Sequence, residues 1–377
     1  MKIQSKRIYL AGMFLPGIIE MENEKIKRIL PYGSETPDHD YGDRMIIPGM
    51  IDVHCHGGIG VDTNDADEPG MIAWSKALLE EGITSFTPTT VTDSVDSLKN
   101  AVAVVAKIID ERTYGAQMVG IHLEGPYVNT EKKGAQPPQH ILKPDPETFK
   151  QINEAAKNNI KIVTLAPELD DGFEFTRYLA DQGIQVALGH SNATFEQGYQ
   201  AVANGANGIT HCYNAMNPLH HRDPSLVGLA MNLDDIFVEV ICDGNHVTWP
   251  ALKGLVDARN NLNCIMVDDA LAAKGCAPGV YQLGDYEVEV RDNGSCYIVN
   301  TQTLAGGSLK FNEGLANLIE KALVPIPVAI NMVTINPARY LKIDDFKGKI
   351  QAGYDGDLVV LNPDYSIQAV YCRGKMV

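Results

Sequence analysis

The chain has 377 residues, 45% of them hydrophobic and 21% charged, which suits a globular protein with a large core and excludes disordered, collagen-like and coiled-coil proteins. Its 31 basic and 48 acidic residues give a net charge of −17, which repels polyanions and argues against nucleic-acid binding. No apolar run approaches the ~20 residues of a membrane span or forms a signal core, and the seven cysteines lack framework spacing. We therefore expect a cytoplasmic protein with reduced thiols and no membrane partner.

In chain order, residues 1–48 come first and show the alternating pattern of β-strands, as do residues 345–377 at the other end. We expect the two ends to pair in a small β-sandwich domain. Residues 49–344 would then form a second domain inserted between them.

From about residue 46, short β-rich runs alternate with amphipathic helical patterns. The strand runs are 45–53, 83–87, 117–123, 160–165, 184–188, 208–212, 236–241 and 262–267. The helical patterns are 71–81, 95–112, 146–157, 173–182, 195–204 and 249–260. Eight strands alternating with helices predict a (β/α)8 barrel, and the absence of a GxGxxG turn disfavours a doubly wound sheet. A hairpin over 286–291 and 296–300 follows the eighth strand.

Polar residues end several of these runs, at the face where such barrels carry their catalytic groups. His54 and His56 follow the first run, Glu124 the third, His190 the fifth and His211 the sixth. The last three offer the mixed oxygen and nitrogen set of a Zn²⁺ or Fe²⁺ site with one position open for water. His54 and His56 alternate along one strand, so both can serve a metal beside Glu124. The sequence therefore predicts a catalytic centre with one or two divalent ions.

Two consecutive acids, Asp268 and Asp269, follow the eighth run. Only one of them can point into the barrel, where a carboxylate opposite the metal takes a proton from water and returns it to a leaving amine. The alternative is that the pair caps a helix or a loop. The residues by themselves leave open which of the two is the base.

Seven segments in order resemble the N-acetylglucosamine-6-phosphate deacetylase family of the amidohydrolase superfamily. They are PGMIDVHCHG (48–57), HLEGP (122–126), GHSNAT (189–194), THCYNAM (210–216), DGNHV (243–247), DDA (268–270) and TLAG (303–306), and the resemblance runs from about 45 to 361. It implies metal-dependent hydrolysis of N-acetylglucosamine 6-phosphate to glucosamine 6-phosphate and acetate. It also implies that Glu124, His190 and His211 hold the main ion, most simply Zn²⁺ with Fe²⁺ or Mn²⁺ as alternatives. Asp269 would be general base and then acid.

The phosphate of such a substrate needs donors that this acidic chain must gather locally. The backbone N–H groups of Asn214 and Ala215 and the guanidinium of Arg222 can supply them, and the resemblance places this segment on the phosphate. The alternative for Arg222 is an ion pair with Asp223 or another surface acid. The resemblance also implies that His246 reaches into the site of a neighbouring subunit, and hence a homodimer.

Three positions depart from the family pattern. Gln136 stands where the family often has a histidine that contacts the sugar and the carbonyl, and an amide cannot become cationic. Asp268 stands where threonine is usual, and it either raises the pKa of Asp269 by repulsion or faces away. Near the expected acetyl pocket, the stretch from Leu304 to Gly307 also differs, with Gly307 where serine is common.

Three other functions compete with this one. N-acetylgalactosamine-6-phosphate deacetylase differs only in the epimer, which metal motifs cannot distinguish. A cyclic amidase of the hydantoinase or dihydroorotase kind predicts a lysine at the end of strand four, where this chain has Lys161 only at the start. A non-catalytic sugar-phosphate-binding relic would tolerate loss of Asp269, which is present.

Overall fold

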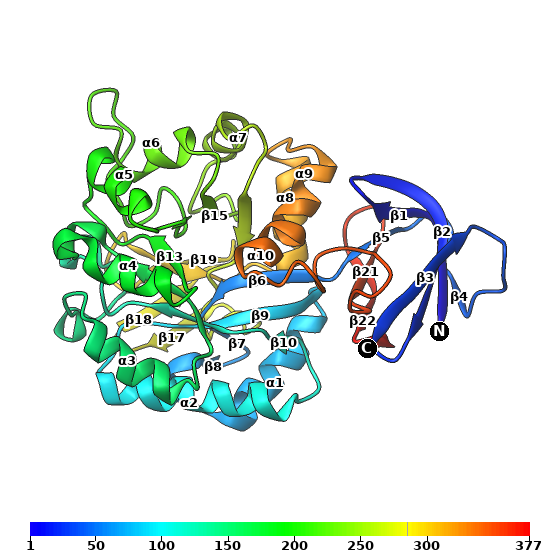
Figure 1. The fold of residues 1–377 in the computed structure, drawn as a ribbon, viewed down its shortest axis with the longest axis horizontal. Coiled ribbons are helices and arrows are strands. Elements are labelled where there is room, and N and C mark those ends of the chain that lie inside the picture. The colour runs from blue at the N-terminus through cyan, green and yellow to red at the C-terminus, as the bar shows by residue number, and fades with distance from the viewer. Residues whose placement is uncertain (285) are drawn as a thin grey trace.

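A ring of eight parallel strands forms the larger part of the molecule (Figure 1). The computed structural model describes residues 1–284 and 286–377. In order of pairing the strands are β6 (Met50–Cys55), β9 (Ile83–Thr90), β11 (Ile121–Glu124), β12 (Ile160–Leu165), β13 (Gln185–Leu188), β14 (Gly208–Ile209), β15 (Phe237–Ile241) and β16 (Cys264–Val267), with β10 (Gln117–Met118) beside β9. The ring closes after β16, where Asp269 N donates to His54 O (3.0 Å) and His56 N to Ala270 O (2.8 Å). The predicted (β/α)8 barrel is confirmed.

Helices cover the outside of this ring and follow the strands in chain order (Figure 1). They are α1 (Glu68–Leu79), α2 (Val95–Glu111), α3 (Pro146–Ala155), α4 (Glu174–Asp181), α5 (Phe195–Ala203), α6 (Ser225–Asn232), α7 (Trp249–Ala258), α8 (Phe311–Glu320), α9 (Ile326–Val333) and α10 (Ile335–Tyr340). Short 3-10 turns lie at Thr63–Asp65, Thr130–Lys132, Pro138–His140, Pro167–Leu169 and Asp171–Phe173. The sequence patterns indicated α1 to α5 and α7, and the structure adds α6 and α8 to α10. Within the described residues, no helix is long and apolar enough to cross a membrane.

The inside of the barrel changes from apolar to polar along its axis. A cluster of buried side chains that includes Ile51, Val53 and Ile162 packs against Tyr340 of α10. The register of β6 against β9 shifts between Asp52 and Cys55. This shift interrupts the alternation of faces, so the histidines that follow also turn toward the barrel axis.

Strands from both ends of the chain form a second sheet beside the barrel (Figure 1). They are β1 (Lys2–Leu10), β2 (Met13–Glu22), β3 (Lys25–Pro31), β4 (His39–Asp40), β5 (Met45–Pro48), β21 (Leu358–Leu361), β22 (Ile367–Cys372) and β23 (Lys375–Met376). β5 lies between β1 and β21, so the two termini pair as expected. The sequence suggested one strand over 45–53, but the structure has two strands separated by Gly49. A Cβ at Gly49 would lie 2.1 Å from Thr84 Oγ1.

This sheet curls back on itself. Ile26 N donates to Tyr354 O and Gly356 N to Glu24 O, both at 2.8 Å, which brings the β2–β3 hairpin to the segment before β21. The enclosed core includes Ile3, Ile8, Ile19, Ile26, Ile46, Leu358, Val360 and Tyr371. Residues from both termini therefore share one small core.

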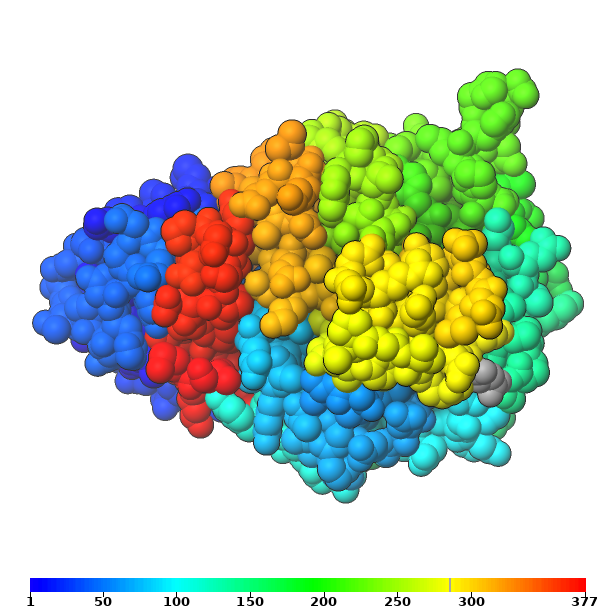
Figure 2. Space-filling view, turned by 180° about the vertical axis from the view of Figure 1, so that it is seen from behind, coloured from blue at the N-terminus to red at the C-terminus, as the bar shows by residue number. Residues whose placement is uncertain are grey.

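A third sheet lies beside the carboxyl end of the barrel. It contains β17 (Gly279–Leu283), β18 (Tyr286–Val290), β19 (Ser295–Ile298) and β20 (Leu304–Gly307), all antiparallel. Figure 2 shows it as a yellow lobe on the barrel surface. A small hairpin, β7 (Gly57–Gly58) with β8 (Val61–Asp62), follows β6. The predicted hairpin is present as β18 and β19, inside a larger sheet than the sequence indicated.

Candidate active site

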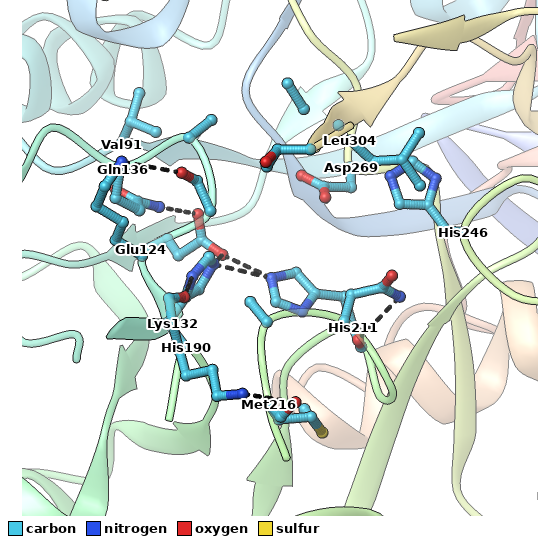
Figure 3. A pocket seen from close by; sticks show the side chains of 18 of the residues that line it. Val91, Glu124, Lys132, Gln136, His190, His211, Met216, His246, Asp269 and Leu304 are labelled. Atoms are coloured by element: carbon cyan, nitrogen blue, oxygen red, sulfur yellow. Dashed lines mark hydrogen bonds and ion pairs between the residues drawn. The ribbon is translucent and has the colours of Figure 1, made fainter. Parts of the chain in front are cut away.

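A cavity of about 590 Å³ opens at the carboxyl end of the barrel, and Figure 3 shows side chains on its walls. His54 lies beneath the cavity and is fully buried. The predicted site residues that line the cavity are His56, Glu124, Gln136, His190, His211, Asn214, Ala215, His246, Asp269 and Leu304. The barrel therefore brings together residues that are far apart in the sequence.

Glu124 is the last residue of β11 and contacts two histidines, His190 after β13 and His211 after β14 (Figure 3). Its Oε1 lies 3.1 Å from His190 Nε2 and 3.1 Å from His211 Nε2, and the two nitrogens are 3.1 Å apart. Both histidines have left-handed backbones, with φ of 48° and 29°. The three side chains thus converge on one point.

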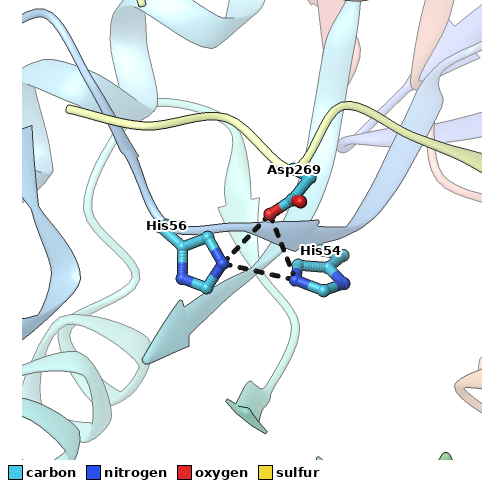
Figure 4. A group of neighbouring side chains, drawn as sticks. All are labelled: His54, His56 and Asp269. Atoms are coloured by element: carbon cyan, nitrogen blue, oxygen red, sulfur yellow. Dashed lines mark hydrogen bonds and ion pairs between the residues drawn. The ribbon is translucent and has the colours of Figure 1, made fainter. Parts of the chain in front are cut away.

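A second group adjoins the first and contains His54, His56 and Asp269 (Figure 4). Asp269 Oδ1 lies 3.1 Å from His56 Nε2 and 3.4 Å from His54 Nε2, and these nitrogens are 3.3 Å apart. Glu124 touches this group as well, because its Oε1 lies 3.4 Å from His54 Nε2 and its Oε2 lies 3.4 Å from His56 Nε2. Glu124 therefore lies between the two groups.

Hydrogen bonds behind the rings determine which nitrogen faces these groups. His190 Nδ1 lies 2.8 Å from Lys132 O, and His56 Nδ1 lies 3.2 Å from Thr89 O. A carbonyl oxygen only accepts, so Nδ1 carries the hydrogen and the Nε2 lone pair of the neutral ring points at the carboxylates. The Nε2 nitrogens and the carboxylate oxygens that face each other are then all hydrogen-bond acceptors. A divalent cation between them would satisfy these acceptors. Imidazole nitrogens and carboxylate oxygens are ligands that such an ion accepts.

Burial and neighbouring charges strongly shift the pKa values in this cluster. Burial lowers the pKa of His54, but the nearby carboxylates, Glu124 foremost, outweigh burial and raise it to about 10, so a divalent ion held at Nε2 would take the place of the second proton of that ring. Burial raises the pKa of Asp269, but His54 and His56 outweigh burial and hold it below its ordinary range. Burial also raises the pKa of Glu124, and the imidazoles, His190 foremost, bring it well below its usual value. Both carboxylates are therefore ionised at neutral pH, which favours a bound cation.

Gln136 occupies a bridging position on the cavity wall. Its Nε2 donates to Glu124 Oε2 and its Oε1 accepts from Thr92 N, each at 2.6 Å. The side chain is 2% exposed. The amide therefore positions Glu124, a role that the sequence comparison with histidine did not reveal.

Asp268 faces away from the cavity. Its Oδ2 lies 2.5 Å from Lys274 Nζ, and the same ammonium lies 2.6 Å from Glu81 Oε2. Lys274 is 3% exposed, so this ion pair is buried. Asp268 therefore faces away from the cavity, which was one of the two possibilities stated for it. The pKa of Asp269 is lowered and not raised.

The predicted phosphate donors are not all in one place. Asn214 and Ala215 line the cavity, whereas Arg222 does not. Arg222 lies in an exposed turn, where its Nη1 is 2.8 Å from His221 Nε2. Part of the segment between β14 and α6 projects from the barrel (Figures 1 and 2), and Arg222 in this segment does not line the cavity of its own chain.

His246 also differs from expectation. It lines the cavity of its own chain, where we expected it in a neighbouring site, and Figure 3 shows it beside Asp269. Its Nδ1 lies 2.7 Å from Asp243 Oδ2 and its backbone N donates to Asp243 Oδ1 at 2.9 Å, which folds the ring back over the barrel. Leu304, at the start of β20, lies on the adjacent wall.

The sequence did not indicate several polar residues at the site. Lys132 and Lys133 both line the cavity, and Lys132 Nζ lies 3.5 Å from Met216 O, whereas Lys133 Nζ donates to Tyr286 Oη at 2.9 Å. Glu239 is buried in the middle of β15. A carboxylate at the centre of the apolar run FVEVI was the available signal for Glu239.

Comparison with known proteins gives consistent findings. The amidohydrolase family model matches residues 45–377. N-acetylglucosamine-6-phosphate deacetylase of Bacillus subtilis is 38% identical over 95% of this chain and 95% of its own length, and N-acetylgalactosamine-6-phosphate deacetylase of Escherichia coli O157:H7 is 34% identical over 88% and 87%. A solved structure of a mutant N-acetyl-D-glucosamine-6-phosphate deacetylase from Mycobacterium smegmatis, in complex with N-acetyl-D-glucosamine-6-phosphate, has a TM-score of 0.94 and 27% identity, covering 100% of this chain and 98% of that one.

Proposed function

The chain belongs to the amidohydrolase family and, within it, to the N-acetylglucosamine-6-phosphate deacetylases, and from this premise we propose how its residues carry out the reaction. The substrate is N-acetylglucosamine 6-phosphate, and water cleaves its acetamide C–N bond to give acetate and glucosamine 6-phosphate. The observation that carries this proposal is the pair of adjoining groups of imidazole and carboxylate around Glu124, open to a sugar-sized cavity.

We propose Glu124, His190 and His211 as the ligands of the main divalent ion, with His54 and His56 available for a second. Zn²⁺ suits this donor set best, and Fe²⁺ or Mn²⁺ also fit. When bound, such an ion activates water for attack near neutral pH and polarises a carbonyl oxygen.

Asp269 is the proposed proton carrier. Its carboxylate lines the cavity, contacts His54 and His56 and is ionised, so it can accept a proton from the attacking water. The protonated carboxyl group of Asp269 then delivers that proton to the sugar nitrogen as the C–N bond breaks. Protons therefore balance between water and the leaving amine.

The phosphate of the substrate is proposed to lie near Asn214 and Ala215, with Lys132 as the cation. Lys132 supports this role because it lines the cavity and, among the described residues, its Nζ has only a long contact with Met216 O. An ammonium contributes a point charge to phosphate binding. Arg222, on its projecting segment, is available to the cavity of a second copy, and we propose a homodimer on that ground.

The seven cysteines are all unpaired, which supports a location in a reducing compartment such as the cytoplasm. N-acetylgalactosamine 6-phosphate is the second candidate substrate, because a relative named for that sugar is 34% identical. It differs from N-acetylglucosamine 6-phosphate at one hydroxyl.

Acetate release from both hexosamine 6-phosphates tests the proposal, with Zn²⁺, Fe²⁺ and Mn²⁺ titrated separately into metal-free protein. We expect metal-dependent turnover with the higher kcat/KM on the gluco epimer. A large preference for the galacto epimer would reverse the assignment of substrate, and turnover that survives complete metal removal would overturn the ligand set. Sedimentation velocity measures the oligomeric state, and a monomer would contradict the proposed dimer.

A further inference from the structure

Glu239 is a buried acid that the proposed reaction does not use. It lies in the middle of β15 and is 1% exposed. Val238 and Val240 on either side belong to the outer core between strands and helices, whereas Ile241 belongs to the inner core of the barrel. By the alternation of a strand, the carboxylate of Glu239 therefore points into the barrel.

The contacts of this carboxylate differ from those of a structural ion pair. In the part of the chain that the structure describes, no lysine or arginine pairs with Glu239, and its Oε1 has no hydrogen-bond partner. Its Oε2 lies 2.9 Å from His54 Nδ1. Burying a carboxylate without a cation is costly, so a purely structural role does not explain why an acid stands here.

The contact with His54 determines the orientation of that ring. A carboxylate accepts, so the Nδ1 of His54 carries a hydrogen, and Nε2 is the nitrogen left to bind an ion. That Nε2 lies 3.4 Å from both Glu124 Oε1 and Asp269 Oδ1. Glu239 therefore aims the Nε2 of His54 at the point where the two groups meet.

The same oxygen also contacts the backbone of the first group, which contains Glu124, His190 and His211. His211 N donates to Glu239 Oε2 at 3.3 Å, and Cys212 N donates to Glu239 O at 2.8 Å. His211 has a φ of 29°, a strained conformation for a residue with a side chain. One buried acid thus fixes the ring of His54 and the backbone of His211, one residue from each group.

We propose that Glu239 is a positioning residue for metal binding, which orients His54 and His211 from behind and adds a negative charge to the site. This inference rests on the proposed function, since it assigns a supporting role to the same ligands. Carboxylates behind ligating histidines fix the tautomer and raise the basicity of the ligand, and their loss commonly costs 10- to 100-fold in metal affinity.

The test measures the Kd for Zn²⁺ of metal-free wild type, E239Q and D170N by competition with a chromophoric chelator, together with the thermal midpoint of each metal-free protein. Asp170 is the matched control, because it is also a buried carboxylate that accepts from backbone N–H groups (Phe175 N, 3.0 Å; Thr176 N, 2.8 Å), but its bonds go to Phe175 and Thr176 and not to a proposed metal ligand. We expect E239Q to raise the Kd for Zn²⁺ about 10- to 100-fold and D170N to leave it unchanged.

A Kd in E239Q equal to that of wild type would overturn the inference, as would an equal rise in D170N, which would indicate a general effect of lost stability. If E239Q does not fold, E239D provides the same comparison, because its carboxylate is one methylene short of His54 Nδ1. Failure of the proposed function has a different signature. Wild type would then bind Zn²⁺ but release no acetate, and the ratio of Kd values would still report on Glu239.

Discussion

The substitution Asp269→Asn isolates the proposed proton transfer from the rest of the site. Asp269 has a left-handed backbone, with φ of 48°. Asparagine adopts this conformation readily, whereas alanine there costs roughly 1–2 kcal/mol. The backbone bonds Asp269 N to His54 O and Gly307 N to Asp269 O are untouched. D269N therefore changes the acid–base group and little else.

We expect D269N to lower kcat about a thousandfold, since general acid–base catalysis typically contributes 10² to 10⁴ and one carboxylate here serves both steps. That loss corresponds to about 4 kcal/mol in activation free energy. The assay is acetate release at saturating metal, with elemental analysis to confirm that the ion is retained. D268N is the control, because Asp268 faces Lys274 and should change stability more than turnover. Turnover of D269N within tenfold of wild type, at full metal content, would refute the assignment.

Three further predictions concern charge. K132M should lower kcat/KM about tenfold or more on the phosphorylated sugar but not on N-acetylglucosamine. K133M should keep the wild-type ratio of kcat/KM between these two sugars. The same ratio in K132M and K133M would contradict the phosphate role of Lys132. K274M should lower the free energy of unfolding by about 3–5 kcal/mol in urea titrations, because two carboxylates lose a buried cation, and a loss below about 1 kcal/mol would contradict this reading. Burial lowers the pKa of His246 but Asp243 raises it above its usual value, so the resulting stabilisation is complete below pH ~6.5 and is lost as pH rises through the folded-state pKa. The stability difference between wild type and D243N should therefore narrow above about pH 6.5, and a constant difference would exclude this linkage.

The barrel was predictable because its signals are local. Each strand is a short apolar run, and each run ends in polar residues that a parallel barrel must place on one face. The break at Gly49 was not predictable, since residues 45–53 form one apolar run and only the approach of Thr84 requires a glycine. Helices α8 to α10 follow the eighth strand, where the count of eight no longer indicates what comes next.

The site was predictable in its ligands and less so in their surroundings. Glu124 and the histidines stand at strand ends, whereas Gln136 and Glu239 act through contacts that only the closed barrel creates. His246 was misplaced because a motif gives no direction for its side chain, and Asp243 turns that side chain back into its own cavity. Arg222 does not line the cavity of its own chain, and nothing in its sequence indicates that the segment projects.

The position of β5 bears on how the chain matures during synthesis. β5 pairs along its full length with β21, so Pro48 meets Leu358, a partner about 310 residues later. Only Gly49 separates β5 from β6, which carries His54 and is followed directly by His56. A nascent chain can assemble the central strands as they emerge from the ribosome, yet the anchor of its first strand is among the last segments to leave. We therefore expect chains that stop before residue 358 to leave β5 unpaired and His54 and His56 poorly held, and hence to be substrates for cellular quality control.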